Sequence, residues 1–345
     1  MKKTFGVVFT FILAAAFLFF ALRGTDLQDL AGIISNASLP FMFLFITFFL
    51  SAHVVRALRW RYIVASQKED VSFLHALGGV LIGYGVNCVV PRLGEVYRSF
   101  FIGHWEKLSR SAMLGTVVVE RIIDIVSLAL SILISVLIFP GNLFEEVTWL
   151  KPTLNITAAL MVGVIILMIL IVKFKEKFYG YIVKFIEIFT HKYAEKIGGI
   201  FKTFAEGFGA LQGRKNYFMT FFWTVVIMLL YGFNAYVGFY MLRINEVYGV
   251  TLSMGWILMT ISAFGVIIPT PGGTGSYHLL VIFVMTALFG IARDLSVAYA
   301  VLTHFISYSL FIILMFVIYG VINYVHGKKG LPKENFFSVL KRRVE

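Results

Sequence analysis

The stretch that decides the fold is GYGVNCVVPRLGEVYR, residues 83–98. It continues residues 77–90, which are almost entirely apolar or small, as in a membrane helix. Pro91 then removes a backbone donor and breaks that helix. Charged residues follow at once: Arg92, Glu95 and Arg98. A helix broken at membrane depth is tolerated only where it is buried in protein or lines a watery cavity, so this stretch predicts the centre of a membrane protein.

A second stretch late in the chain has the same character. Residues 263–280, AFGVIIPTPGGTGSYHLL, form another apolar segment that Pro and Gly interrupt. Paired interruptions in the two halves of a membrane protein indicate the site of a transporter that is built from repeats.

The composition is that of a polytopic membrane protein. Of the 345 residues 59% are hydrophobic and only 14% are charged, with a mean hydropathy of +0.88, which excludes a soluble globular protein. The formal net charge of +12 indicates a positive-inside bias rather than binding of nucleic acid. Because Cys88 is the single cysteine, no disulfide can form within the chain.

We expect an all-α polytopic membrane protein with about six full spans and two re-entrant hairpins. The expected spans are residues 4–22, 40–55, 112–139, 154–172, 217–242 and 295–325. The first is long enough to span and lacks a convincing cleavage site, so we interpret it as a membrane helix rather than a signal peptide. Two interrupted regions, residues 73–102 and 250–291, are each either a pair of full spans or a hairpin. Arms of roughly 15 apolar residues favour hairpins, since a span needs about 20.

Charge predicts the orientation. If both interrupted regions return to the side they entered, the basic segments gather on one side: Lys2, Lys3, Arg56, Arg59, Arg61, Lys68, Lys107, Arg110, residues 173–215 and residues 328–343. The positive-inside rule then places both termini in the cytoplasm of a bacterial-type inner membrane. Charge does not separate a deep hairpin from two full spans, because both return to the same side.

This orientation makes the chain a single membrane domain, residues 1–345, with an inverted-topology repeat. The order span, span, hairpin, span occurs in residues 4–139 and again in residues 154–325, starting from opposite sides. The alternative is the apparent symmetry that any such helix count produces. Residues 173–215 alternate aromatic with charged residues and predict an amphipathic helix, either in the cytoplasmic interface or packed on the bundle ends. Residues 326–345 form a basic cytoplasmic tail.

Charged residues also stand in the span that follows the first hairpin. Glu120 and Asp124 are four residues apart in apolar sequence, so they repel and need a cation. Arg121 lies on the neighbouring face, and Arg92 or Arg98 of the hairpin are natural partners. One reading is an ion-pair lattice that pins the hairpin to the span. For the two hairpin arginines we favour binding of a headgroup phosphate by guanidinium forks and free backbone N–H groups.

The second motif has no acidic residue and one histidine. Its glycines allow close backbone approach and leave amides open as an anion nest, although a plain tight turn would need them too. The candidate substrate-binding residues are therefore Asn87, Arg92, Glu95, Arg98, Glu120, Arg121, Asp124, Pro271, Gly272, Gly273, Gly275, Tyr277 and His278. We expect no catalytic residue, cofactor or metal, since no P-loop, HExxH motif or nucleophile elbow is present.

These motifs resemble the lysylphosphatidylglycerol synthase transmembrane region, also called the flippase-like domain family. The resemblance is carried by three motifs in order: Asn87, Pro91, Gly94-Glu95 and Arg98, then Glu120-Arg121-x-x-Asp124, then Pro271-Gly-Gly-x-Gly275. It implies movement of aminoacylated phosphatidylglycerol or another lipid between leaflets. The synthase domain of bifunctional members has no counterpart, so we expect no synthase activity. His278 stands where the family pattern has an acid that would suit a lysyl amine.

The resulting prediction is a lipid flippase for a phospholipid, an aminoacylated lipid or a lipid-linked precursor with an anionic headgroup. Its partners are membrane lipids and not nucleic acid, and a homo-oligomer is compatible with the sequence. Three alternatives stay open. One is a membrane enzyme that uses Glu95 with His278 as an acid–base pair, one is a transporter of a soluble anion, and one is a subunit that docks a partner through residues 173–215.

Overall fold

The computed structural model describes residues 2–65, 67–173, 184, 211–331 and 336. Every regular element in this part of the chain is helical and none is a strand, which confirms the predicted all-α fold. By length and apolar composition four of the described helices can cross a membrane, or five if one bent pair counts as a span. The predicted count of six spans therefore stays a prediction. Most of the predicted amphipathic segment and of the basic tail lies outside the described residues.

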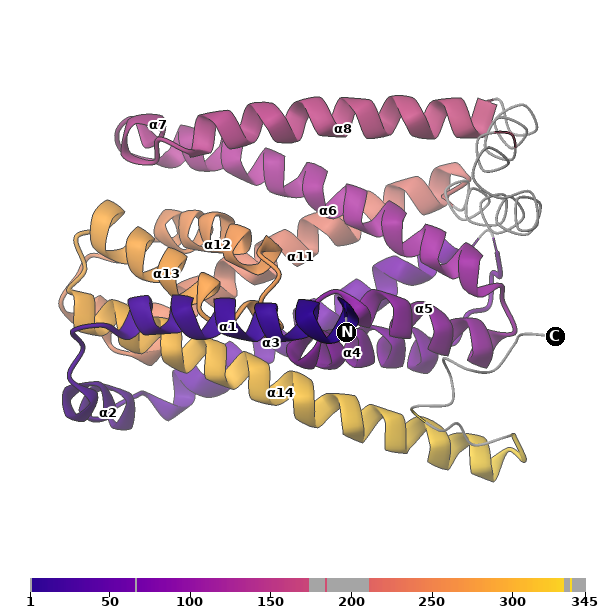
Figure 1. The fold of residues 1–345 in the computed structure, drawn as a ribbon, viewed down its shortest axis with the longest axis horizontal. Helices are drawn as coiled ribbons and strands as arrows, with labels where there is room; N and C mark the ends of the chain where they lie inside the picture. Colours follow the sequence, from indigo (N-terminus) through magenta and orange to yellow (C-terminus); the bar gives the residue numbers. More distant parts are fainter. Residues whose placement is uncertain (1, 66, 174–183, 185–210, 332–335, 337–345) are drawn as a thin grey trace.

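The first half of the chain forms six helices (Figure 1). They are α1 (Lys2–Leu22), α2 (Leu27–Ser35), α3 (Leu39–Val64), α4 (Phe73–Val89), α5 (Leu93–Glu106) and α6 (Arg110–Ile138). The chain bends by 85° between α1 and α2. Asp26 causes α2 to begin there, since its carboxylate accepts the free amides of Gln28 and Asp29.

The second half has the same kinds of element. They are α7 (Leu143–Glu146), α8 (Leu150–Lys173), α11 (Arg214–Met241), the 3-10 turn η2 (Ile244–Glu246), α12 (Leu252–Ile267), the 3-10 turn η3 (Pro271–Gly273), α13 (Ser276–Phe283), the π turn η4 (Val284–Leu288) and α14 (Arg293–Lys328). Each of the six predicted spans coincides with a described helix, most of which extend a few residues beyond the predicted bounds.

The first interrupted region is an antiparallel pair of helices, α4 and α5. The chain breaks at Pro91, and α5 begins after Arg92, whose φ of 63° lies in the left-handed region. The arms are in close contact, because a Cβ atom on Gly94 would lie only 1.9 Å from the Gly83 carbonyl oxygen. At the other end the Ser72 amide donates to Glu106 Oε1 at 2.9 Å, so the chain returns to the end where it entered.

The second interrupted region is also antiparallel, with α12 followed by α13. At its tip Ser276 Oγ donates to the Gly265 carbonyl at 2.6 Å. At its base the Ala292 amide donates to the Tyr248 hydroxyl at 3.0 Å, which joins the residues that precede α14 and α12. Arms of 17 residues in α4 and 16 in α12 are short for a span, as expected of re-entrant segments. The position of both hairpins in a bilayer stays a prediction.

Helix α14 shows that the two hairpins approach each other from opposite ends of the bundle (Figure 1). It starts beside the base of the second hairpin and ends where His326 Nε2 lies 2.9 Å from His75 Nε2, at the base of the first. Between these ends Tyr308 donates its hydroxyl to the Cys88 carbonyl, near the tip of the first hairpin, at 2.8 Å. The two tips therefore meet beside the middle of α14.

The tips are in direct contact. Arg92 Nη2 donates to the carbonyl of Ile267, the last residue of α12, at 3.2 Å. A Cβ atom on Gly272 would lie 2.8 Å from the Tyr308 ring and 3.4 Å from Cys88 Cα, so η3 lies against the end of α4. We call these contacts the tip junction: Cys88, Arg92, Ile267, Gly272 and Tyr308.

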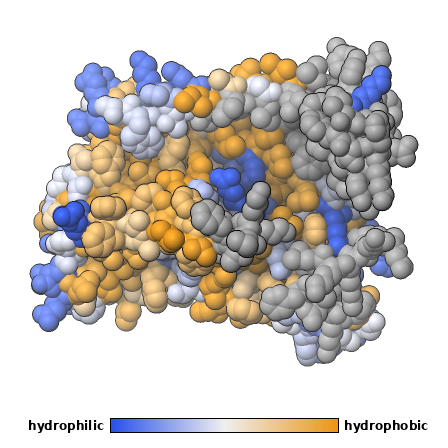
Figure 2. Space-filling view, in the orientation of Figure 1, coloured by the Kyte–Doolittle hydropathy of each residue, from blue (hydrophilic) through white to orange (hydrophobic). Residues whose placement is uncertain are grey.

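The outer surface is apolar over much of the visible face (Figure 2). Large side chains point outward, including Phe43 at 73% and Leu137 at 83% exposure. Because such a surface is unfavourable in water, it fits contact with lipid tails.

Candidate functional site

Two arginines of α3 meet two acids of α6 inside the bundle. Arg56 Nη1 donates to Glu120 Oε1 and to Asp124 Oδ2, both at 2.8 Å. Arg59 Nη2 donates to Asp124 Oδ1 at 2.7 Å and to Glu120 Oε1 at 3.1 Å. The spacing explains the match, because residues three or four apart share one helix face. Two cations on one helix therefore face two anions on the other.

A third arginine comes from the first hairpin. Arg98 on α5 places Nη2 2.5 Å from Glu120 Oε2, the oxygen that the α3 arginines leave open. Its guanidinium also stacks on Trp60, with Cζ 3.5 Å from the ring centroid. Trp60 is fixed in turn by a hydrogen bond from its Nε1 to Thr116 at 3.3 Å. The hairpin is thus attached to α3 and α6 through one buried side chain.

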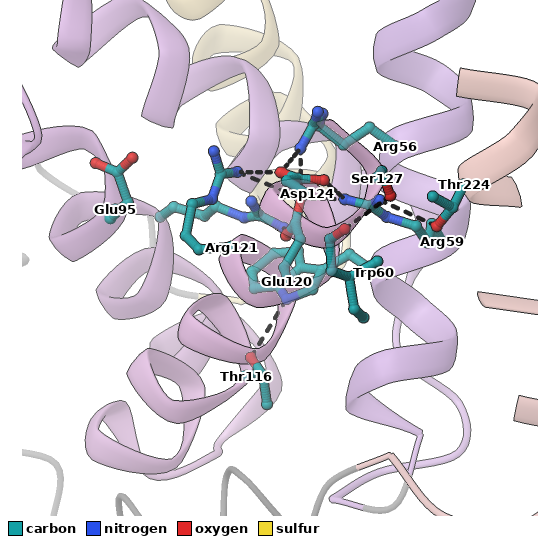
Figure 3. A network of polar contacts seen from close by, with 12 residues as sticks. Arg56, Arg59, Trp60, Glu95, Thr116, Glu120, Arg121, Asp124, Ser127 and Thr224 are labelled. Atoms are coloured by element: carbon teal, nitrogen blue, oxygen red, sulfur yellow. Dashed lines mark hydrogen bonds and ion pairs between the residues drawn. The ribbon is translucent and has the colours of Figure 1, made fainter. Parts of the chain in front are cut away.

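Arg121 completes the group at its outer edge. Its Nη2 lies 3.4 Å from Glu120 and 3.5 Å from Asp124, the longest ion pairs of the set. Its side chain is 37% exposed, whereas those of the other three arginines are at most 5% exposed. We call this group the arginine cluster: Arg56, Arg59, Arg98, Arg121, Glu120 and Asp124 (Figure 3).

The cluster holds more positive than negative charge. Four guanidinium groups face two carboxylates, which leaves a formal excess of two positive charges. The buried Nε atoms of all four arginines have no hydrogen-bond partner among the described residues. A site of this kind can bind a further anion, since guanidinium groups form strong bonds with phosphate and carboxylate oxygens.

Aromatic rings border the cluster on the side of the first hairpin. His53 on α3 stacks on Tyr84 of α4 and on Phe311 of α14, with ring centroids 4.9 and 4.8 Å apart. Both ring nitrogens of His53 are buried and unpartnered among the described residues. Arg56 reaches the same region, since its Nη2 donates to the Tyr231 hydroxyl at 3.2 Å. Aromatic rings therefore border the charged groups near Arg56.

The other predicted residues of the first hairpin do not join the cluster. Asn87 closes the break, since its Oδ1 accepts the Gly94 amide at 2.8 Å and its Nδ2 faces Glu95 at 3.3 Å. Figure 3 shows Glu95 apart from the ion pairs. Of the two hairpin arginines named as natural partners of the acids of α6, Arg92 does not reach them, because its side chain donates to Ile267 in the tip junction. Arg98 alone makes that predicted contact.

The second motif forms a tight loop without charge. Gly272, Gly273 and Gly275 have φ values of 57°, 77° and 83°, which side chains rarely adopt. Gly275 also lies against α1, where a Cβ atom would be 2.7 Å from the Ala14 carbonyl. Pro271, buried, begins the 3-10 turn of this loop.

His278 and Tyr277 follow this loop and face α14. His278 Nδ1 accepts the Gly275 amide at 3.3 Å, and its ring lies 4.6 Å from that of His304. The Tyr277 hydroxyl is 3.1 Å from Thr303 Oγ1. Because Glu95 and His278 have separate partners, no described contact supports the acid–base pair of the enzyme alternative.

Arg56 and Arg59 are not among the site residues predicted from the sequence. The predicted second span ends at residue 55, whereas α3 continues to Val64 and buries both arginines. A charge lowers mean hydropathy even where an ion pair compensates it, so a hydropathy window ends too early. Two signals could have found them: their spacing with His53 on one helix face, and the need of Glu120 and Asp124 for cations.

No metal centre is present in the described part of the chain, where no three His, Cys, Asp or Glu side chains gather suitably.

Figure 2 shows a hydrophilic patch recessed within the apolar face. At the edge of the described cluster, Arg121 is the arginine that reaches the surface.

Comparison with known proteins identifies relatives over nearly the whole chain. The family model described as the lysylphosphatidylglycerol synthase TM region matches residues 6–315. UPF0104 membrane protein PH1989 of Pyrococcus horikoshii is 26% identical over 336 residues, covering 89% of this chain and 93% of the relative. UPF0104 membrane protein MJ1595 of Methanocaldococcus jannaschii is 23% identical over 336 residues, covering 93% and 97%. No solved structure matches.

Proposed function

Because this chain belongs to the lysylphosphatidylglycerol synthase transmembrane region family, we propose that it passes an anionic lipid headgroup between the leaflets of the cell membrane. One observation carries this proposal. A buried cluster with two excess positive charges includes Arg98 of the first hairpin, and the tip of this hairpin contacts the tip of the opposed one.

The energetics of the cluster support a charged substrate. A charge at the centre of a bilayer costs about 2.5–3.5 kcal/mol on insertion scales, so such residues are rare without a function. Glu120 and Asp124 compensate only half of the four positive charges. A headgroup phosphate would compensate more of them and use the free Nε donors.

The packing of the helices supports alternating access. The two halves of the chain make corresponding helix contacts. In the first half α3 packs on α4 and α5 packs on α6, and in the second half α11 packs on α12 and α13 packs on α14. Helix α4 also contacts α14 as α12 contacts α6. An inverted repeat of residues 4–139 and 154–325 would produce such contacts, because each helix pair of one half has a counterpart in the other. The two repeats would open in turn around the cluster.

The proposed mechanism assigns each group one task. The four arginines bind the phosphate, and Glu120 and Asp124 hold their guanidinium groups in place between turnovers. The tip junction closes the path while the site is empty, through the bonds from Arg92 to Ile267 and from Tyr308 to Cys88. The acyl chains stay against the apolar outer surface, so only the polar headgroup crosses the interior. The base of the first hairpin faces the cytoplasm, together with both termini.

The first test is to identify the lipids that co-purify with the protein. Mass spectrometry would compare the wild type with Arg59→Gln, since Arg59 is fully buried and bonded to both acids. Lys151→Gln, which removes an exposed charge at the start of α8, is the matched control. We expect one anionic lipid class to be enriched in the wild type and the control but lost in Arg59→Gln. Equal lipids in all three proteins would reject the proposal.

A further inference from the structure

The cluster also indicates how much charge its ligand carries. Resting on the proposed function, we infer that the site takes a lipid phosphate with two negative charges, a phosphate monoester or a diphosphate diester, rather than a singly charged phosphodiester.

The charge balance of the cluster favours a ligand with two negative charges. Every oxygen of Glu120 and Asp124 already lies within 3.1 Å of at least one guanidinium nitrogen, so both carboxylates are ion-paired. Four arginines against these two acids leave an excess of two. A phosphodiester would compensate one of the two charges and leave the other uncompensated. A phosphate monoester, which carries about −1.5 to −2 at pH 7, would compensate both.

The neighbouring groups do not remove this excess. Tyr231 and Thr224 accept hydrogen bonds from the α3 arginines but are neutral. Glu95 of the first hairpin does not compensate it either, since its carboxylate faces the Asn87 amide without an ion pair to any described residue. Uncompensated charge is costly at membrane depth, so an anion with matching charge is the favoured occupant.

Among the arginines of the cluster, Arg121 is the one that an entering ligand can contact first. Arg121 is the only arginine of the cluster with a substantially exposed side chain, and its ion pairs of 3.4 and 3.5 Å are the longest. It can therefore turn from the acids to an incoming phosphate more easily than Arg59, which is fully buried. The ligand enters at Arg121 and reaches the buried Nε atoms behind it.

The test compares two lipids that differ by one charge. Purified full-length protein in phosphatidylcholine nanodiscs at pH 8 receives phosphatidic acid, a monoester, or phosphatidylmethanol, its singly charged methyl ester, with identical acyl chains. Glycerol 3-phosphate serves as the soluble monoester. Occupancy is measured by native mass spectrometry. We expect phosphatidic acid to bind about tenfold or more tightly than phosphatidylmethanol, as one further close ion pair provides.

A charge variant tests the cause of the preference. Arg121→Gln lowers the excess of positive charge to one and removes only the longest ion pairs of the cluster. We expect this variant to bind both lipids with similar affinity, whereas Lys151→Gln keeps the preference of the wild type. A preference that persists in Arg121→Gln would contradict the charge argument.

The outcomes separate this inference from the proposed function. Equal binding of the two lipids to the wild type would overturn the inference and leave headgroup transport standing. Tight binding of glycerol 3-phosphate, equal to that of phosphatidic acid, would support a doubly charged ligand but overturn lipid transport. Binding of none of the three probes would overturn both.

Discussion

At the scale of single residues, Glu120 is the point on which the site converges. Its two oxygens face guanidinium nitrogens of Arg56, Arg59, Arg98 and Arg121, which come from three different helices. Glu120 is fully buried, so the low dielectric of its surroundings strengthens every one of these contacts. The carboxylate therefore joins α3, α5 and α6 electrostatically, and not only through packing.

We predict that Glu120→Gln destabilises the protein strongly. The variant leaves four arginines with one acid, and removal of one partner of a buried pair typically costs about 3–5 kcal/mol. The measurement is the Tm of the detergent-solubilised protein, followed through its helical circular dichroism.

A double-variant cycle provides the control. Arg98→Gln removes one of the charges that Glu120 compensates, so the pair of substitutions should cost less than the sum of the single ones. Strict additivity would mean that these two side chains do not interact, and a Glu120→Gln protein with the Tm of the wild type would contradict the central role of this carboxylate.

At the scale of elements, close backbone packing determines the shape of the first hairpin. A Cβ atom on Gly94 would lie 1.9 Å from the Gly83 carbonyl oxygen and 2.7 Å from Asn87 Oδ1. A side chain at this position must therefore separate the arms of α4 and α5. Since Arg98 lies one turn further along α5, the separation would also move it relative to Glu120.

We predict that Gly94→Ala lowers both stability and lipid binding. Overpacking typically costs about 1–3 kcal/mol, and here the clash is with backbone that cannot turn away. Gly163→Ala in α8 is the control, because a Cβ atom at Gly163 would meet nothing within 4 Å and alanine favours helix. Both variants are compared by Tm. Equal effects of the two substitutions would contradict the close approach of the arms.

The base of the first hairpin is held by a second group of charges. Glu106 Oε1 accepts from the Ser72 amide at 2.9 Å and lies 2.6 Å from His75 Nδ1, while Oε2 pairs with Lys68. Burial opposes ionisation of Glu106, but the bonds from His75, Lys68 and Ser72 outweigh it and hold its pKa at about 2. His75 in turn faces His326 of α14, so this end of the bundle joins three helices.

The pKa of Glu106 predicts an acid-sensitive stability. Because folding lowers this pKa from 4.5 to about 2, the contribution of the carboxylate is complete above pH 4.5 and is lost as the pH falls towards 2. The wild type should therefore lose more stability across this window than Glu106→Gln, which has no such group to protonate. Thermal unfolding at steps of pH would measure the difference, and parallel curves would contradict it.

Sequence reasoning predicts the two helix breaks well and the site incompletely. Pro91 and the glycines of residues 271–275 punctuate apolar sequence so clearly that both breaks follow from local chemistry. The partners of Glu120 do not follow, because Arg56 and Arg59 are more than 60 residues away in the chain. Which cations approach an acid depends on how α3 packs against α6, and helix packing is a property of the whole bundle rather than of local sequence.

At the scale of the whole molecule, α14 connects all the parts that would move. Its 36 residues contact the base of each hairpin and both tips, and it contains no proline. An uninterrupted helix of this length measures about 54 Å at 1.5 Å per residue, more than the thickness of a bilayer. The two hairpin bases should therefore lie on opposite sides of the membrane.

Cysteine labelling tests this arrangement. In a Cys88→Ala background, Glu69→Cys lies near the base of the first hairpin and Asp29→Cys lies in α2, and both positions are exposed. We expect a membrane-impermeant maleimide to label Asp29→Cys from outside intact cells and Glu69→Cys only after the cells are opened. Labelling of both from one side would end the inverted-repeat hypothesis.

The excess of positive charge also has a consequence for what the protein keeps out. A polar interior within a membrane protein risks becoming a leak for protons and metal cations, which would dissipate the ion gradients of the cell. Fixed positive charge along a pathway raises an electrostatic barrier against cations. The same arginines that suit a phosphate would therefore hinder the passage of protons and metal cations. The protein could then open to either leaflet without dissipating the ion gradients.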